Sequence, residues 1–391
     1  MRNAPSTKCA CKSARAKNGG CRNLGLLPLA IGVALTTARA SAFDARGRQF
    51  IGFTRFSAFT KSVGEQPGQL VLTSPVIVGR MGWSELIASW NAQMPDAAIL
   101  KIEARAFYPE RATKYYTMAL WSGNPGRNPR QSVLNQQDAD GNVSTDTLVL
   151  RQPSDRLQLR LTFGGDDPRR PRLKFLGLSL ADTNAVLTLL SPNRSAWGKT
   201  ISVPERSQMA YPDGNVLCSP TTVSMMMAFW SEKVNRPELN RDVPEIAREV
   251  YDPNWQGTGN WPFNTAYAGS FRGLRGYVTR LSDVSELEDW IAAGIPVGLS
   301  VCYNKLRGKP GEPSGHLVVC VGFTEQGDPV INDPGTSLNV RKTFPRQNLI
   351  AAWAYSRNAA YLIYPADAEV PKDRFGHWAS WTSRRRIILK R

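Results

Sequence analysis

The segment CSPTTVSMMMAFW, residues 218–230, decides the fold assignment of the second half of the chain. Apolar residues recur at helical spacing from Val223 to Trp230, and Pro220 fits the first turn of a helix. Cys218 stands directly before that turn, where the helix dipole and unpaired backbone amides stabilise a thiolate. The segment therefore predicts a helix with a candidate nucleophile at its start, although an ordinary buried thiol would leave the same local pattern.

Beyond this helix the pattern alternates between helices and apolar strands. Further helices are expected at 243–251 and 285–293, the second opened by a capping box of Ser285 and Glu288. Strands are expected at the apolar runs 295–303, 316–323, 330–332 and 359–364. Helices followed by a mostly antiparallel sheet predict an α+β fold for this part.

The first half of the chain has a different pattern. From residue 43 to about 190, short β-rich runs are broken by Gly, Pro, Asn and Asp, which predicts a β-sandwich of jelly-roll type. The polar stretch 191–199 marks a boundary. Trp83, Trp90 and Trp121 either are buried or line a sugar-binding face. The expected domains are a β-sandwich at 43–195, a second domain at 200–366 and a basic C-terminal tail at 367–391.

The first 42 residues read as a secretory signal peptide. They hold seven Lys or Arg and no acid, followed by an apolar run and small residues. Cleavage is expected after Ala40 or Ala42, giving a periplasmic or extracellular bacterial protein without stable membrane insertion. An uncleaved anchor is the alternative, but twelve apolar residues fall short of the roughly 20 that span a bilayer.

Charge adds little about partners. The chain carries 49 Lys and Arg against 32 Asp and Glu, a net charge of +17, which falls to about +10 once the signal peptide is removed. The basic cluster at 384–391 could bind an anionic wall polymer or remain solvated. No nucleic-acid recognition motif accompanies it, so no nucleic-acid partner is expected.

Cysteine and histidine counts narrow the chemistry. Signal cleavage leaves Cys218, Cys302 and Cys320, and an odd number requires at least one thiol outside any internal disulfide. Cys302 and Cys320 lie in apolar runs and are expected as core residues or as a disulfide. Any Cys–His mechanism must use His316 or His377. His316 opens an apolar strand, a firm mount for a base, whereas His377 lies in the tail.

A catalytic imidazole also needs a partner that orients its second nitrogen. Asp333 follows the strand 330–332, and a hairpin through 324–329 would bring it near His316. Asn332 is the fallback, because an amide can orient an imidazole as a carboxylate does. Which of the two points at His316 depends on strand register.

Three motifs in order resemble the C-thirty-nine-like family of papain-fold cysteine peptidases. They are Cys218 with its helix, Gly315-His316 with its apolar run, and Asn332-Asp333-Pro334. The resemblance covers residues 202–365. This family is similar to the peptidase domains that cleave double-glycine leaders from bacteriocins. The resemblance implies a papain-like peptidase domain.

The resemblance also implies roles for single residues. Cys218 would be the nucleophile, His316 the general base and then acid, and Asp333 the third member of a triad. The amide of Gln208 would help to bind the oxyanion, although it lies ten positions before Cys218. The turn at 212–214 could absorb the extra length. Ser219 stands where the family commonly has Gly.

The expected reaction is acyl transfer through a thioester, which requires no metal or organic cofactor. The expected substrate is a peptide or protein, and the loop 252–262, with Trp255 and Trp261, would form a wall facing it. Two alternatives remain. The same triad could act as a peptidoglycan stem-peptide endopeptidase held on cell-wall glycan by the β domain. The chain could instead be a non-catalytic module that binds glycan or protein.

Overall fold

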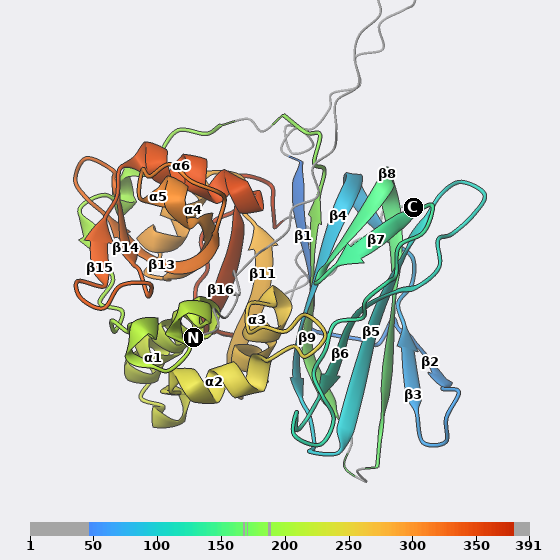
Figure 1. Ribbon diagram of the computed structural model, residues 1–391. Helices are drawn as coiled ribbons and strands as arrows, with labels where there is room; N and C mark the ends of the chain where they lie inside the picture. Colours follow the sequence, from blue (N-terminus) through green and yellow to red (C-terminus); the bar gives the residue numbers. More distant parts are fainter. Residues whose placement is uncertain (1–46, 167–168, 170, 187–188, 379–391) are drawn as a thin grey trace, which may run out of the picture.

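The computed structural model describes residues 47–166, 169, 171–186 and 189–378 (Figure 1). The predicted signal peptide with its cleavage sites at Ala40 and Ala42, and the basic cluster at 384–391, lie outside these residues. Across the described ranges, no helix has both the length and the apolar character that crossing a bilayer requires.

An N-terminal unit is built on one antiparallel sheet. Within the described residues it follows the order β1-β9-β4-β8-β3-β2, with β5 and β7 also pairing with β8, and β6 with β5. The strands are β1 (Arg48–Phe53), β2 (Thr60–Val63), β3 (Leu70–Thr73), β4 (Ile77–Gln93), β5 (Ala98–Phe107), β6 (Tyr116–Ser122), β7 (Gly141–Ser144), β8 (Thr147–Gly165) and β9 (Arg172–Ala181). The jelly-roll arrangement remains a prediction.

Two long strands, β4 and β8, organise this unit. Inward and outward residues alternate along the second half of β8, which places Leu157, Leu159 and Leu161 in the core. In contrast, β4 is buried without interruption from Trp83 to Ala92, because a second sheet covers its other face. Trp83, Trp90 and Trp121 are at most 2% exposed. They are core residues, so the sugar-face interpretation of these tryptophans is wrong.

A C-terminal unit contains a second antiparallel sheet with helices packed against it, so this part of the chain is α+β as predicted. The sheet order is β11-β16-β12-β13-β14-β15, with β10 pairing with β13. Its strands are β10 (Lys199–Thr200), β11 (Leu274–Arg280), β12 (Val297–Cys302), β13 (Gly315–Phe323), β14 (Pro329–Asn332), β15 (Arg341–Thr343) and β16 (Ala359–Pro365). Its α-helices are α1 (Cys218–Lys233), α2 (Val243–Val250), α3 (Trp261–Ser270), α4 (Val284–Ala292), α5 (Tyr303–Leu306) and α6 (Arg346–Trp353).

Two local expectations were wrong. The loop expected at 252–262 ends in a helix, α3, whose first turn holds Pro262 and whose N-cap is Asn260. The predicted capping box at Ser285 and Glu288 is not formed. The side chain of Asp283 caps α4 instead, accepting hydrogen bonds from the backbone amides of Ser285 and Glu286.

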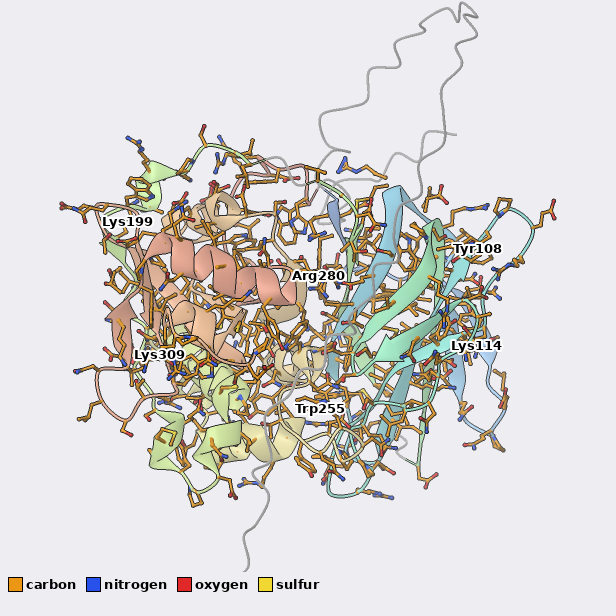
Figure 2. All side chains as sticks on the ribbon, turned by 45° about the horizontal axis from the view of Figure 1, so that its top comes forward. Tyr108, Lys114, Lys199, Trp255, Arg280 and Lys309 are labelled. Carbon is orange, nitrogen blue, oxygen red and sulfur yellow. The ribbon has the colours of Figure 1, made fainter. Side chains whose placement is uncertain are left out.

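The two units are joined by a hydrogen-bonded and aromatic interface. The side-chain amide of Asn91 on β4 bonds both to the carbonyl of Gly276 on β11 and to its amide. Phe50 of β1 stacks against Tyr277 at 4.5 Å between ring centroids. Figure 2 shows Arg280 between the units, where it forms an ion pair with Glu85 of β4 at 2.8 Å. The boundary between domains near residues 195–200 remains a prediction.

The first part of the expected basic tail is packed rather than solvated. Phe375 is buried, and Arg374 forms an ion pair with Asp289 on α4. The carbonyl of His377 accepts a hydrogen bond from the backbone amide of Phe50. The segment 367–378 therefore fastens the two units together. Of the expected tail, residues 379–391 lie outside the described ranges.

We expect Asp146 to make the stability of this interface depend on pH. Its carboxylate accepts hydrogen bonds from the amide of Trp261 and the hydroxyl of Thr147, and burial raises its pKa to about 6. Between the unfolded pKa near 3.9 and this value, the folded state holds more protons. The free energy of unfolding should therefore fall with rising pH, by roughly 2–3 kcal/mol.

Asp146→Asn keeps the acceptor for Trp261 but cannot ionise. Denaturant unfolding at intervals from pH 4 to pH 8 should show a smaller decrease in the free energy of unfolding for this variant than for the wild-type protein. If both proteins have the same pH dependence, the assignment to Asp146 is wrong.

Candidate active site

Cys218 is the first residue of α1, and its thiol lies in a buried setting. The amide and hydroxyl of Thr221 both donate to the carbonyl of Leu217, which closes the first turn. Close packing of α1 on β12 requires Gly298, since a Cβ there would meet the Thr222 methyl at 3.1 Å. The helix is thereby held with its positive end at Cys218.

Ser219 replaces the glycine expected from the resemblance without leaving a polar group unpaired. It is fully buried, and its hydroxyl hydrogen-bonds to the hydroxyl of Tyr361 on β16 at 2.8 Å. The first turn of α1 therefore accommodates a small polar residue.

His316 is the second residue of β13 and pairs with Val301 of β12. Its Nε2 hydrogen-bonds to Oδ1 of Asp333 at 2.8 Å, and both side chains are buried. The ring lies against Tyr303, with 4.1 Å between centroids. Because Asp333 occupies Nε2, Nδ1 is the ring nitrogen left for proton transfer.

The hairpin between β13 and β14 brings Asp333 to this position. Val319 pairs with Asn332, and a bulge between Cys320 and Gly322 shifts the register. Asp333 follows directly after β14, and its amide donates to the carbonyl of Val340. The predicted hairpin is therefore present. It also contains a bulge, which the turn residues of the sequence did not predict.

Asn332 points elsewhere. Its Nδ2 donates to the carbonyl of Val203, and its Oδ1 accepts from Nε of Arg341. Successive residues of an extended segment face opposite sides, so Asn332 and Asp333 do not share a partner. The structure places Asp333, not the fallback Asn332, against His316.

The Asp333 carboxylate is surrounded by donors. Burial alone would raise its pKa, but hydrogen bonds from His316, the amide of Gly335 and the hydroxyl of Tyr303 hold the pKa below its usual value. Burial, followed by the Asp333 charge, raises the pKa of Tyr303, which keeps its hydroxyl a donor. Asp333 is therefore ionised at neutral pH.

Gln208 begins a short 3-10 turn beside these residues. The backbone amide of Gln208 donates to the carbonyl of Pro334, next to Asp333. The turn at 212–214 does absorb the ten-residue spacing: Asp213 has a φ of 56°, and a Cβ on Gly214 would lie 2.2 Å from the Gln208 carbonyl. Oε1 of Gln208 is shielded from solvent without a partner, and within the described residues its side-chain amide makes no hydrogen bond.

Comparison with protein families agrees with this geometry. Residues 200–361 match the Peptidase_C39 like family, and residues 69–181 match the Peptidase C39 N-terminal domain. The resemblance inferred from the motifs is therefore confirmed, and the chain is assigned as a peptidase, a hydrolase acting on peptide or protein. Among curated proteins, none matches the chain.

The other two thiols within residues 200–361 are core residues. Cys302 and Cys320 are free and buried, so the disulfide considered between them is absent. Burial raises the pKa of Cys320 to about 12. A buried apolar environment disfavours the thiolate on which reactivity depends.

The second histidine also has a structural place. Nδ1 of His377 bonds to Glu286 at 2.8 Å, and Nε2 bonds to the hydroxyl of Thr279 at 3.0 Å. The ring stacks on Trp378 at an interplanar angle of 8°. His377 therefore secures the C-terminal segment of the peptidase and leaves His316 as the candidate base.

The loop at 252–262 is held by contacts within the protein, and the substrate-facing wall expected there remains a prediction. The Asp252 carboxylate accepts from the amide of Ser132 in the N-terminal unit and from Nδ2 of Asn260. The ring of Trp255 covers Gly257 and Gly259, and the amide of Trp261 donates to Asp146. Figure 2 shows Trp255 where the two units meet. Both tryptophans therefore serve internal packing and the interface.

No metal-binding arrangement accompanies the triad residues. Throughout the part of the chain that the structure describes, no group of three or more His, Cys, Asp or Glu side chains is placed to hold a metal ion.

Tyr303 was missed by the sequence analysis and yields a prediction. Tyr303→Phe removes the hydrogen bond to Oδ2 of Asp333 but keeps the ring against His316. We expect kcat/KM to fall about 10- to 100-fold, in line with the loss of a hydrogen bond to a charged group. Because Tyr303 lowers the pKa of Asp333, the acid limb of the pH–rate profile should move to higher pH. An unchanged profile together with unchanged kcat/KM would remove Tyr303 from the site.

Proposed function

We propose that the chain is an exported cysteine peptidase that hydrolyses peptide bonds through Cys218, His316 and Asp333. The observation that carries this proposal is the buried 2.8 Å hydrogen bond from Nε2 of His316 to Asp333. This hydrogen bond lies within the residues that match the family. Nearby, α1 begins at Cys218, whereas the other two cysteines after residue 42, Cys302 and Cys320, lie within strands.

In the proposed reaction, Nδ1 of His316 takes the proton of the Cys218 thiol. The sulfur then attacks the substrate carbonyl, and the carbonyl electron pair moves to oxygen. The amides at the start of α1 and the side-chain amide of Gln208 would hold this oxyanion. When the C–N bond breaks, His316 returns the proton to the leaving amine and a thioester remains.

Hydrolysis of the thioester repeats the sequence with water. His316 accepts a proton from the attacking water, and the restored Cys218 thiol leaves together with the carboxylic acid product. Asp333 stabilises the imidazolium that forms in both halves, and Tyr303 fixes the carboxylate. Gly335 keeps this region close-packed, because a Cβ there would lie 3.1 Å from Nε2 of His316.

Export and cell-wall contact are supported unequally. Export depends on the signal-peptide pattern of residues 1–42. Contact with the wall was expected through the β domain and the basic cluster at 384–391, and the tryptophans considered for a sugar-binding face of the β domain are buried. We therefore favour a peptide or protein substrate over a peptidoglycan stem peptide.

The experiment uses the chain without its first 42 residues and presents it separately with a peptide library and with purified peptidoglycan. We expect cleavage in the peptide library and none in the wall polymer. Cys302→Ala is the matched control, because it removes a buried thiol without touching the triad. Release of wall fragments with no peptide cleavage would favour the endopeptidase alternative, and a folded protein inactive on both would contradict the proposal.

A further inference from the structure

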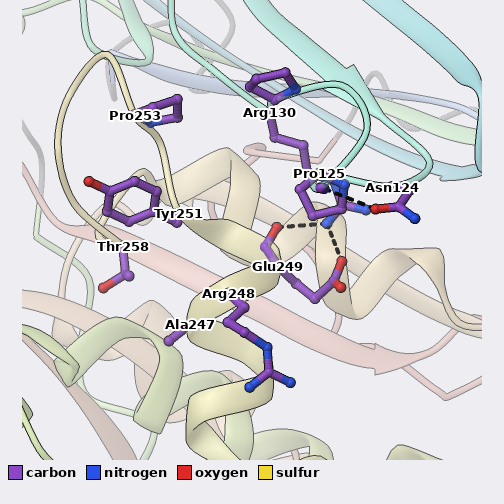
Figure 3. A pocket seen from close by; sticks show the side chains of 11 residues that line it. Asn124, Pro125, Arg130, Ala247, Arg248, Glu249, Tyr251, Pro253 and Thr258 are labelled. Atoms are coloured by element: carbon purple, nitrogen blue, oxygen red, sulfur yellow. Dashed lines mark hydrogen bonds and ion pairs between the residues drawn. The ribbon is translucent and has the colours of Figure 1, made fainter.

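A hollow of about 730 Å³ opens where the N-terminal unit meets α2 and the loop that follows it (Figure 3). Residues 124–130 of the N-terminal unit form one side. Residues 247–258, from the end of α2 onward, form the other. We call this hollow the junction pocket. Neither unit forms it alone, and the triad does not line it.

The floor of the junction pocket is fixed by Arg130. Its guanidinium is buried, lies 4.0 Å from the ring centroid of Trp121, and bonds to both the carbonyl and the carboxylate of Glu249 on α2. Figure 3 shows Arg130 reaching across from the N-terminal unit to make these bonds. The pocket is therefore built into the junction and does not depend on a bound molecule.

Its remaining walls combine apolar surface with a positive charge. Pro125, Pro129 and Pro253 offer rigid apolar faces without amide donors, and Tyr251 is 46% exposed. Arg130 and Glu249 neutralise each other, whereas no interaction of the Arg248 side chain is found within the described residues. One positive charge beside an apolar hollow favours an apolar side chain next to a carboxylate.

The junction pocket adjoins the active site through Thr258. The hydroxyl of this lining residue donates to the carbonyl of Val216 at 3.0 Å. Val216 precedes Cys218 by two residues, and two residues of chain span at most about 7 Å. The Thr258 side of the pocket therefore lies close to the start of α1 and to Cys218.

We propose that the junction pocket is an exosite that binds a segment of the substrate polypeptide in which an aromatic or aliphatic residue adjoins an acidic one. The inference rests on the proposed peptidase function, because it assigns the occupant as part of the substrate. It also gives the N-terminal unit a role in substrate selection, since that unit supplies half of the wall.

Binding is measured first, on the Cys218→Ala chain, so that catalysis is not required. The probes are two end-blocked hexapeptides, Ala-Glu-Phe-Glu-Phe-Ala and its analogue with Lys for both Glu, titrated by calorimetry. We expect at least tenfold tighter binding of the Glu peptide. Arg248→Glu should reverse this preference, and Tyr251→Ala should weaken both peptides. Arg272→Glu is the matched control, an exposed arginine outside the pocket, and should leave the preference unchanged.

Turnover is then measured on the enzyme that retains Cys218. Two cleavable peptides are compared, a long one that carries the Glu-Phe-Glu-Phe segment and a short one that lacks this segment. Arg248→Glu should raise KM about tenfold for the long peptide alone. Equal affinity for the two hexapeptides, or a preference that Arg248→Glu does not alter, would overturn the exosite. Selective binding without any turnover would sustain the pocket as a peptide site and count against the peptidase function.

Discussion

Replacement of Cys218 by alanine is expected to lower kcat/KM for peptide hydrolysis by at least about 10⁴-fold. Without the sulfur no thioester can form, and only the binding and oxyanion contributions to rate remain. The thermal midpoint should change little, because the thiol is small and sits at the start of a helix that is held by its other buried residues. Hydrolysis of a cleavable peptide and a melting curve measure the two effects.

Cys302→Ala and Cys320→Ala are the controls for this variant. Both remove buried thiols from the same sheet. They should lower stability by about 1 kcal/mol each and leave the activity of the folded protein intact. If Cys218→Ala retained a tenth of wild-type activity, or if Cys302→Ala lost as much as Cys218→Ala, Cys218 would not be the nucleophile.

Removal of the Asp333 side chain carries the second large effect. In Asp333→Ala, Nε2 of His316 loses its acceptor, so neither the tautomer nor the ring position is held. We expect kcat/KM to fall about 10²- to 10⁴-fold. Asp333→Asn should retain more activity, since an amide oxygen still accepts from Nε2 while the charge that stabilises the imidazolium is gone.

Asn332→Ala is the neighbouring control. It removes hydrogen bonds to Val203 and Arg341 and should therefore destabilise the sheet edge without changing the chemistry of the folded fraction. Titration with an active-site thiol reagent corrects each rate for the fraction folded. Loss of chemistry in Asn332→Ala together with full activity in Asp333→Ala would reverse their assigned roles.

The sequence predicted the hairpin but could not choose between Asn332 and Asp333. The choice depends on the bulge between Cys320 and Gly322, which shifts the pairing of β13 with β14. A Cβ on Gly322 would lie 2.2 Å from the carbonyl of Lys199. The bulge therefore lies where β13 also contacts β10, a strand more than 100 residues earlier in the chain.

Other elements escaped the sequence analysis because they are buried on more than one side. α3 is buried over most of its length, so it has no polar face to reveal a helical period. β4 is buried from Trp83 to Ala92 because a second sheet packs on it, and alternation is lost there. Gln152 and Pro153 interrupt the apolar pattern of β8, so the pattern does not indicate a single continuous strand there.

Tyr303 shows a different limit. It follows β12, thirteen residues before His316, and reaches the triad only because β12 and β13 pair with Cys302 opposite Gly315. A tyrosine after an apolar run has no distinctive signature. The candidate histidine was easier to assign, because the chain has two histidines and only His316 opens an apolar strand. The bond of His377 to Glu286 in the structure agrees with that choice.

The most direct test of the central claim is the rate at which iodoacetamide alkylates each cysteine as a function of pH, with the modified residues identified by mass spectrometry. We predict that Cys218 reacts at least 100-fold faster than Cys302 or Cys320. Its reaction should persist well below the ordinary thiol pKa near 8.5, and His316→Ala should abolish this advantage. Slow alkylation of Cys218 that follows an ordinary thiol titration and is unaffected by His316→Ala would contradict the proposed nucleophile and base.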